Sequence, residues 1–572
     1  MATFLLRVVL LLGLVFLGVS PSYAADLSDR RYLQAVEAEK EGQWLKACRL
    51  YDELVRKDRT HPLARLGYQR CLRRLYQTLR HADPSYRTTL AKLSVSQALD
   101  LLEETTGVLA TAHPESHRVS LEALFTHGLV ELRNALEDPE FLRYYLASAK
   151  SSSIAAYKNR LLNWPVPTFA SKTDLREQVL AVIRSAARDG LSPRPVLMAA
   201  FVLEFAAGAT NAIDEYGLFL TPGHLAFTQA MLKGRITHPG LEVGLRDDQI
   251  QVTHVYPKSA AAEAGLVSGD RLLRINGVSV ADLPVEAIAE KLRGPAGSSV
   301  ELEIERFRDP VKLLRRPVNL PSVEYARENF DGSVVLRLRI NYFGESTFQE
   351  VKDALASIVA TGDSLQGLLL DLRGNPGGLF ESAVRISELF LDEGTIVIGR
   401  SPFKKYDRTF KAANPGFVTE VPIVVLIDGD TASAAEVLAG ALKESRTSRF
   451  TTLVMGQTTH GKGSIQCVMP LERAADKSTA IRITVAKLFS PTNQPYSGKG
   501  ITPHLPSDLE GEALLNEARR QLLERIRPMG IGAMRLMEPM GGPIAEEPMA
   551  HEPIGRDPLG VSQTLAASPE RD

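Results

Sequence analysis

The 572-residue chain has too few cysteines for a disulfide framework, since only Cys48, Cys71 and Cys467 occur. Cys48 and Cys71 could pair if their helices face each other, and Cys467 would then be left over. The 11 histidines are scattered, and neither an HExxH nor a CxxC spacing is found. We therefore expect no metal and no cofactor.

Excess charge and long apolar runs are also lacking. The formal net charge is −1 and no basic patch stands out, which argues against RNA or DNA as partners.

Residues 1–24, MATFLLRVVLLLGLVFLGVSPSYA, combine one arginine, an apolar run too short to span a bilayer, and small residues at Ser22 and Ala24. That pattern is typical of a secretory signal peptide. We expect an exported, soluble protein, periplasmic or extracellular, that meets a membrane at most through an uncleaved N-terminal segment.

Two segments carry residue types suited to hydrolysis. Ser433 lies in TASAAEVLAGAL (431–442), directly after the apolar run VPIVVLI (421–427), and Lys462 lies in GQTTHGKGSIQ (456–466). A serine between a buried strand and a helix lies at the positive end of the helix dipole, where developing negative charge is stabilised. A lysine can take its proton only as a neutral amine, so burial must lower its pKa from about 10.4 toward roughly 7 to 8. The alternative is a helix-capping serine and a loop lysine.

A third segment, LLLDLRGNPGG (368–378), is an apolar strand followed by a Gly/Pro turn, which lets the backbone approach a ligand closely. With TASAAEVLAGAL, GKGSIQ and TVAKLFSPTNQPYSGKGITP (484–503), it resembles the four sequence blocks of the carboxy-terminal processing, or tail-specific, proteases. The resemblance implies a serine endopeptidase in which Ser433 is the nucleophile, Lys462 the general base and Gln466 the group that orients the lysine.

The resemblance also implies an oxyanion hole made by the amide of Ala434 and the amide of Gly377 or Gly378. Thr431 stands where the family often has a first serine. The chain between Ser433 and Lys462 is also a few residues longer than is usual in the family, and the extra residues fit a surface loop at 443–452.

Two further side chains near the site could compete for a catalytic role. His460 replaces a usual aromatic residue, and we interpret it as a pocket-lining or solvated side chain. Cys467 is interpreted as a buried apolar residue and not as a nucleophile.

Residues 239–307 form a separate unit. Short alternating runs around two helices predict a small sheet, and SAAAEAGLVSGDRLLRINGVSV (259–280) resembles the centre of a PDZ domain. PDZ domains add a peptide to a sheet edge and hold its terminal carboxylate with backbone amides. The carboxylate-binding loop is expected at Gly240, Leu241, Glu242 and Val243. Glu242 replaces a usual glycine, so it could repel a carboxylate, or the alignment is displaced by two residues; the unit could also be a spacer.

The remaining segments complete the predicted domain order. Residues 25–165 are expected to be helical, with one helix pair at 30–75 reminiscent of a tetratricopeptide repeat, and they either dock an adaptor or act as a rigid spacer. A helical segment at 170–235 contains DEYGLFLTP (214–222), which resembles the turn before the PDZ unit in the processing proteases. Residues 527–572, rich in Pro, Gly and Met, are predicted to be a disordered tail.

The fold class expected is multidomain α/β: a helical N-terminal domain, a PDZ domain and a mixed α/β core at 320–508. Apolar strands at 334–340, 367–373, 421–427 and 452–456 alternate with helices, which predicts a sheet rich in parallel strands. The resemblance implies a core like that of the crotonases and the ClpP peptidase. The turns that carry Gly377 and Ser433 both follow strand ends, where open α/β sheets bind ligands, so they are expected to meet.

We therefore expect an exported serine endopeptidase with a Ser/Lys dyad that cleaves proteins recognised near their exposed C-termini through the PDZ domain. One alternative is a catalytically idle, secreted peptide-binding scaffold. Another is an acyl-CoA enzyme on the same core fold, which would share an oxyanion hole but has no use for a Ser/Lys pair or a signal peptide.

Overall fold

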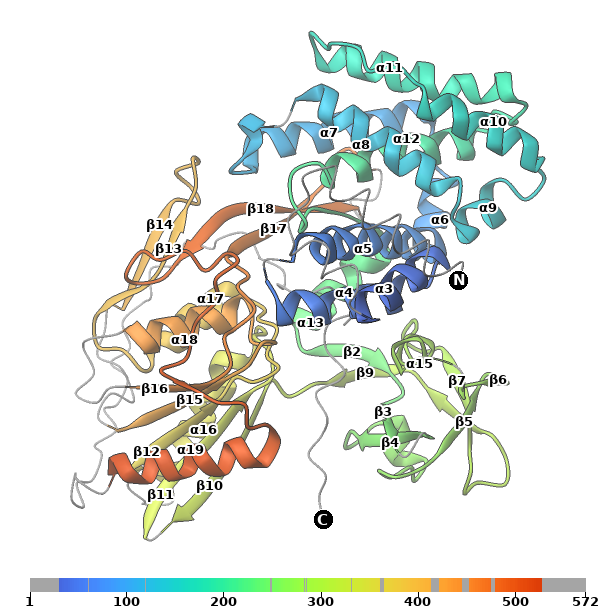
Figure 1. Ribbon diagram of the computed structural model, residues 1–572. Coiled ribbons are helices and arrows are strands. Elements are labelled where there is room, and N and C mark those ends of the chain that lie inside the picture. The colour runs from blue at the N-terminus through green and yellow to red at the C-terminus, as the bar shows by residue number, and fades with distance from the viewer. Residues whose placement is uncertain are drawn as a thin grey trace, which may run out of the picture. The chain divides into compact units, whose positions relative to one another are not determined.

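The computed structural model describes residues 30–526 except 60, 119, 247–248, 282, 284, 331, 361–364, 413–420, 445–451 and 475–478. The expected signal peptide and C-terminal tail lie outside the described residues. The chain divides into two compact units (Figure 1). The helical unit runs to Leu225 and includes Ser401–Phe403 and Gln466–Ala486, and the sheet unit comprises Ala226–Arg400, Lys404–Ile465 and the chain from Lys487 onward.

The helical unit is built around one helix that is buried on all sides. Its helices are α3 (Arg30–Lys40), α4 (Trp44–Lys57), α5 (Pro62–Ala82), α6 (Pro84–Leu90), α7 (Val95–Ala112), α8 (Leu121–Ala135), α9 (Pro139–Tyr145), α10 (Ser151–Leu162), α11 (Lys172–Ser185) and α12 (Pro195–Thr210). Apart from Glu204 and Thr210, helix α12 is apolar around its whole circumference, as expected for a central helix, and it packs against α7 and α8. A Cβ atom on Gly208 would lie 2.6 Å from the His127 carbonyl oxygen of α8, so only glycine permits this approach. Cys48 and Cys71 are buried free thiols on α4 and α5.

A β-hairpin completes the core of the helical unit. Strands β17 (Ser464–Pro470) and β18 (Ala480–Phe489) pair, and β1 (Leu218–Leu220) pairs antiparallel with β18. Leu471, Ala474 and Ile481 belong to the same apolar cluster as the residues of α7, α8 and α12. The hairpin end is therefore anchored in the helices, although residues 464–489 were expected in the mixed α/β core.

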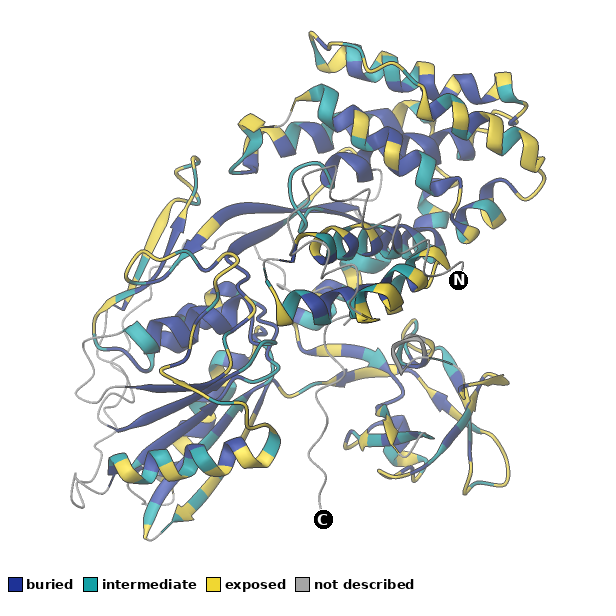
Figure 2. Ribbon diagram, viewed as in Figure 1, coloured by how far each residue is buried: buried dark blue, intermediate teal, exposed yellow. Residues whose placement is uncertain are grey.

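The core of the sheet unit is a six-stranded sheet in which only the first pair is antiparallel. Its order is β10 (Val323–Phe330), β11 (Ser333–Ile340), β12 (Gly367–Asp371), β15 (Ile423–Ile427), β16 (Leu453–Gly456) and β19 (Leu505–Pro506). Strands β12, β15 and β16 are buried along their length (Figure 2). Continuous apolar strands are typical of parallel sheets covered on both faces, and the predicted parallel-rich sheet is confirmed.

Four helices cover this sheet: α16 (Thr347–Ala360), α17 (Phe380–Glu388), α18 (Ala434–Glu444) and α19 (Gly511–Ile526). The first three were predicted from the sequence. Helix α19 was not, and it packs Leu514, Leu522 and neighbouring residues against one face of the sheet, opposite α17 and α18 (Figure 1). Short elements flank the core: α13 (Pro222–Leu232), β13 (Gly394–Arg400) and β14 (Arg408–Ala412). No helix in the described ranges has both the length and the apolar character needed to cross a membrane.

The segment predicted as a PDZ unit contains short strands and two helices, as expected. Strands β2 (Arg235–His238) and β9 (Arg316–Asn319) form a ribbon, β3 (Leu241–Arg246) pairs with β4 (Gln249–Val255), and a four-stranded sheet has the order β6 (Val278–Ser279), β5 (Leu272–Ile275), β7 (Ser299–Ile304) and β8 (Val311–Leu314). The helices are α14 (Ala260–Glu263) and α15 (Val285–Leu292). The strands and helices of this segment enclose a separate apolar cluster that includes Ala261, Ile288 and Leu302.

A buried charge network joins three helices of the helical unit. The carboxylate of Glu204 on α12 accepts hydrogen bonds from Gln77 Nε2 (2.6 Å) and Arg80 Nη2 (2.8 Å) of α5, and His81 Nε2 lies 3.0 Å away. Glu131 of α8 also contacts Arg80, at 3.1 Å. Burial alone would raise the pKa of Glu204, but the charges of Arg80 and His81 lower this pKa to about 2.

Glu204→Gln should lower the free energy of unfolding of the helical unit by about 3 kcal/mol, because one partner of a fully buried ion pair is removed. Urea denaturation followed by circular dichroism at pH 7 measures this change. Glu177→Gln, at an exposed position of α11, is the control and should change the stability by less than about 0.5 kcal/mol. Equal effects of the two substitutions would contradict the stabilising role of the network.

Candidate active site

Ser433 lies at the turn between β15 and α18, in a backbone conformation that serine rarely adopts. Its φ is +56°, in the left-handed region. The residue is buried but keeps some contact with solvent, with 8% of its surface exposed. Unusual backbone angles of this kind are found at functional sites, where the surrounding structure holds them. We call residues 428–433 the serine turn.

Glu436, in the first turn of α18, holds the serine turn and the segment 457–463, which we call the lysine loop. Its buried carboxylate accepts hydrogen bonds from the amides of Ser433 (2.7 Å), Gly461 (2.7 Å) and Lys462 (2.9 Å), and from the Thr459 hydroxyl (2.6 Å). Burial raises the pKa of Glu436, and the four donors partly offset that effect. Because Glu436 caps the helix through the Ser433 amide, the serine hydroxyl is not required as the cap.

Lys462 is almost completely buried, with 3% of the residue exposed. Its loop is packed so closely that a Cβ atom on Gly463 would lie 2.1 Å from the Ser497 amide nitrogen. His460, two residues earlier, is exposed, and its backbone amide donates to the Thr431 carbonyl at 2.9 Å. The burial expected for the lysine is therefore present, and the histidine side chain is on the surface.

The glycine turn, residues 374–378, packs directly against the serine turn. A Cβ atom on Gly377 would lie 2.8 Å from Ser433 Cβ and 3.0 Å from the Ala434 amide nitrogen. The Asn375 carbonyl accepts a hydrogen bond from Ala432 N (2.9 Å), which joins the two turns. The sequence prediction that these turns meet is confirmed.

The amides expected to form an oxyanion hole differ in their hydrogen bonds. The Gly377 amide donates to Asn375 Oδ1 at 2.8 Å. No acceptor for the amide of Gly378 or of Ala434 is found among the described residues. The Gly378 position also requires glycine, because an added Cβ would lie 2.0 Å from the Phe343 carbonyl oxygen.

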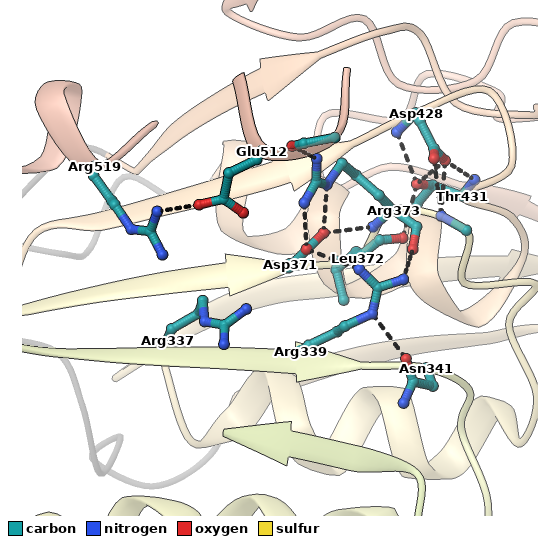
Figure 3. Close-up of polar contacts among 12 residues, drawn as sticks. Arg337, Arg339, Asn341, Asp371, Leu372, Arg373, Asp428, Thr431, Glu512 and Arg519 are labelled. Carbon is teal, nitrogen blue, oxygen red and sulfur yellow. Dashed lines mark hydrogen bonds and ion pairs between the residues drawn. The ribbon is translucent and has the colours of Figure 1, made fainter. Parts of the chain in front are cut away.

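A polar network behind these turns fixes the ends of β12 and β15 (Figure 3). Burial alone would raise the pKa of Asp371, but hydrogen bonding to Arg373 (2.7 Å) and the nearby Arg339 (3.0 Å) lower it. Asp428 accepts the amides of Gly374 (3.0 Å) and Thr431 (2.9 Å). The Thr431 hydroxyl donates to the Leu372 carbonyl at 2.9 Å, so the threonine in place of the usual serine joins the serine turn to the residue that follows β12.

Gln466 lies on β17, four residues after Lys462, and is buried. Its Nε2 donates to the Thr484 hydroxyl of β18 at 3.4 Å. The neighbouring Cys467 is a free thiol with 2% exposure, in agreement with its interpretation as a buried apolar residue.

The predicted peptide-binding residues surround the start of β3. The Gly240 carbonyl accepts a hydrogen bond from Tyr256 N (2.9 Å), Leu241 is buried, and Val243 continues the strand. Glu242 accepts a hydrogen bond from the Tyr256 hydroxyl. Among the described strands β3 pairs only with β4, and α15 packs against β3.

Comparisons with known proteins match two regions of the chain. The model of Peptidase family S41 matches residues 335–507, and a PDZ domain model matches residues 251–306. The carboxy-terminal-processing protease of Bartonella bacilliformis is 33% identical over 309 residues, which cover 52% of this chain and 68% of that protein. The chain belongs to the carboxy-terminal processing protease family. It is accordingly a serine peptidase, and the resemblance inferred from its sequence blocks is confirmed.

Other relatives are similar over half of the chain or more. The carboxyl-terminal-processing protease of Synechocystis sp. is 33% identical over 51% of this chain and 67% of its own length. The carboxy-terminal processing protease CtpA of Bacillus subtilis is 32% identical, and the match covers 53% of this chain but 62% of that relative. A solved photosystem II D1 C-terminal processing protease has 24% identity and a TM-score of 0.35, covering 68% of this chain and 94% of that one.

Glu436 was not singled out from the sequence, although its spacing from Ser433 is that of a capping box. Glu436→Gln should lower kcat/KM about 10- to 100-fold, because an amide in place of the carboxylate leaves buried donors unsatisfied at a cost of about 1–3 kcal/mol. Hydrolysis of an unfolded protein substrate measures this effect. The control is Glu381→Gln, an exposed glutamate in the first turn of α17; an equal loss there would contradict the role given to Glu436.

Proposed function

We propose that this protein is an exported endopeptidase with a Ser433/Lys462 dyad that cleaves proteins near their C-termini. The observation that carries the proposal is Glu436, whose single carboxylate contacts the backbone of both Ser433 and Lys462. The buried position of Lys462 supports its role as the base, because burial disfavours the charged ammonium. The names of the bacterial relatives support cleavage near C-termini.

In the proposed mechanism, the neutral amine of Lys462 removes the proton from the Ser433 hydroxyl as the oxygen attacks the scissile carbonyl carbon. The tetrahedral intermediate then collapses, the peptide C–N bond breaks, and the lysine returns the proton to the leaving amine. A water molecule, deprotonated by the same lysine, hydrolyses the acyl-enzyme and restores Ser433. Gln466 holds the lysine side chain during both steps.

The oxyanion is held by two backbone amides in this proposal: that of Ala434, at the start of α18, and that of Gly378. The choice of Gly378 over Gly377 is supported by their hydrogen bonds, because the Gly377 amide already donates to Asn375 Oδ1. Losing one oxyanion donor typically lowers kcat about 100- to 1,000-fold.

Substrate tails bind the PDZ unit in this proposal by adding a strand to the edge of β3, with the terminal carboxylate near Gly240, Leu241, Glu242 and Val243. The absence of a second strand partner for β3 among the described strands supports this edge as the binding position. The hydrogen bond of Glu242 to Tyr256 occupies the carboxylate that would otherwise face the substrate tail. The signal-like residues 1–24 support export, with membrane contact at most through that segment, and the helical unit remains a candidate for adaptor docking.

Ser433→Ala and Lys462→Ala should each reduce turnover of an unfolded protein to background while leaving binding of the substrate tail unchanged. Mass spectrometry of the products locates the cleavage sites. Lys443→Ala, on the last turn of α18, is the matched lysine control and should retain activity. A secreted scaffold would show no hydrolysis in the wild type, and a Lys462→Ala enzyme with full activity would rule out the dyad.

The PDZ proposal predicts that a C-terminal amide on a substrate peptide raises Kd at least about tenfold relative to the free carboxylate, since charge-assisted hydrogen bonds to backbone amides are lost. Fluorescence anisotropy with the Ser433→Ala protein measures binding without cleavage. The same peptide acetylated at its N-terminus is the control and should bind normally. Equal affinity for the amide and the acid would show that the terminal carboxylate is not recognised.

A further inference from the structure

The lysine loop packs against residues 496–501, which we call the backing segment. The Thr459 amide donates to the Ile501 carbonyl at 3.2 Å, and the Thr459 hydroxyl accepts a hydrogen bond from the Ile501 amide at 2.7 Å. Further along the loop, the Gly461 carbonyl accepts a hydrogen bond from the Gly498 amide at 2.9 Å. The two segments are therefore joined at two positions of the loop, both shortly before the lysine.

Lys462 stands between two glycines that lie against the backing segment. A Cβ atom on Gly461 would lie 3.0 Å from the Gly500 amide nitrogen, and one on Gly463 would lie 2.1 Å from the Ser497 amide nitrogen. Gly461 also has a φ of +86°, a conformation that glycine adopts without steric cost. A side chain at either position would push the two backbones apart, so the chain is fitted for close contact on both sides of the lysine.

The Thr459 hydroxyl joins the backing segment to Glu436. It has one proton, which it donates to Glu436 Oε1 at 2.6 Å, and its oxygen accepts the Ile501 amide. Thr459 is completely buried, so both hydrogen bonds are made away from water, where an unsatisfied amide is costly. Valine has a similar shape to threonine but can make neither bond.

The backing segment also packs against helix α18, which carries Glu436. Tyr496 is buried, and a Cβ atom on Gly440 of α18 would lie 2.2 Å from the Tyr496 hydroxyl oxygen and 3.1 Å from Ile501 Cδ1. Glycine at this position of the helix therefore gives room to both ends of the segment. Helix α18 thus holds the backing segment directly at Gly440 and, through Glu436 and Thr459, by hydrogen bonds.

We propose that Thr459 is a positioning residue for the catalytic base: its hydroxyl holds the lysine loop between Glu436 and the backing segment, which keeps Lys462 buried. This inference rests on the proposed Ser433/Lys462 function. The base must be neutral to accept a proton, and burial favours the neutral amine. Loss of the Thr459 hydroxyl releases one side of the loop, admits water to the amine and favours its charged form.

The test compares Thr459→Val with Thr459→Ser, which keeps the hydroxyl. Thr459→Val should lower kcat/KM for an unfolded protein substrate about 10-fold at pH 7, because a buried amide and a buried carboxylate oxygen each lose a partner. The loss should be in kcat, with KM unchanged, since Thr459 acts on the base and not on the bound substrate. Thr459→Ser should restore most of the rate.

The pH profile of kcat/KM supplies a readout that a purely structural role would not move. The acid limb of this profile reports the pKa of the base in the free enzyme. Because a more hydrated amine has a higher pKa, the limb should move to higher pH in Thr459→Val, and the loss of rate should shrink as the pH rises. The substitution removes no ionisable group, and Glu436 keeps its three backbone donors.

Gly440→Ala disturbs the backing segment from helix α18 and tests the inference should Thr459→Val not fold. The added methyl group would overlap the Tyr496 hydroxyl, so this variant should also lower kcat/KM and move the acid limb to higher pH. Tyr496→Phe removes that hydroxyl, and combining it with Gly440→Ala should restore most of the rate. A loss that Tyr496→Phe does not relieve would contradict the role given to the backing segment.

Thr452→Val is the matched control, because Thr452 is a buried threonine, 9% exposed, at the opposite end of β16 from the lysine loop; it should keep wild-type kinetics. Wild-type kinetics for Thr459→Val, or a uniform loss with an unmoved acid limb, would overturn the positioning role while leaving the dyad intact. Full activity of Lys462→Ala would overturn the dyad and, with it, this inference.

Discussion

The carboxylate of Glu436 is the interaction on which the rest of the site depends. It accepts hydrogen bonds from backbone amides of two segments separated in the chain, the serine turn and the lysine loop. It does so inside the protein, where unpaired amides are costly. A hydroxyl or amide side chain could not satisfy so many donors at once, since a carboxylate alone offers two oxygens without a proton. The helix start, the turn and the loop are therefore one cooperative arrangement.

The second constraint is the hairpin that leaves the lysine loop. Ser464 begins β17 only two residues after Lys462, and the far end of the hairpin is buried among helices with Leu471, Ala474 and Ile481. The far end of the hairpin is therefore fixed by the packing of the helical unit.

Much of the sheet unit could be predicted from the sequence, because buried parallel strands appear as continuous apolar runs, as in VPIVVLI (421–427). Ser433, Lys462 and the glycine turn were found because strand ends and short motifs are local signals. Glu436 was missed since a glutamate on a helix usually faces solvent, and its burial depends on a loop that folds over it later in the chain. The pairing of β1 with β18 joins segments more than 250 residues apart, such as Leu218 and Arg482, and no local pattern reveals it.

The left-handed backbone at Ser433 sets a limit on how this site could change. A β-branched residue is strongly disfavoured at such an angle, so an exchange of serine for threonine, conservative in chemistry, is opposed by the main chain. Glycine would relax the same angle at no steric cost. The residue that this backbone angle favours is therefore one that lacks the hydroxyl, and the serine stands against the preference of its own backbone.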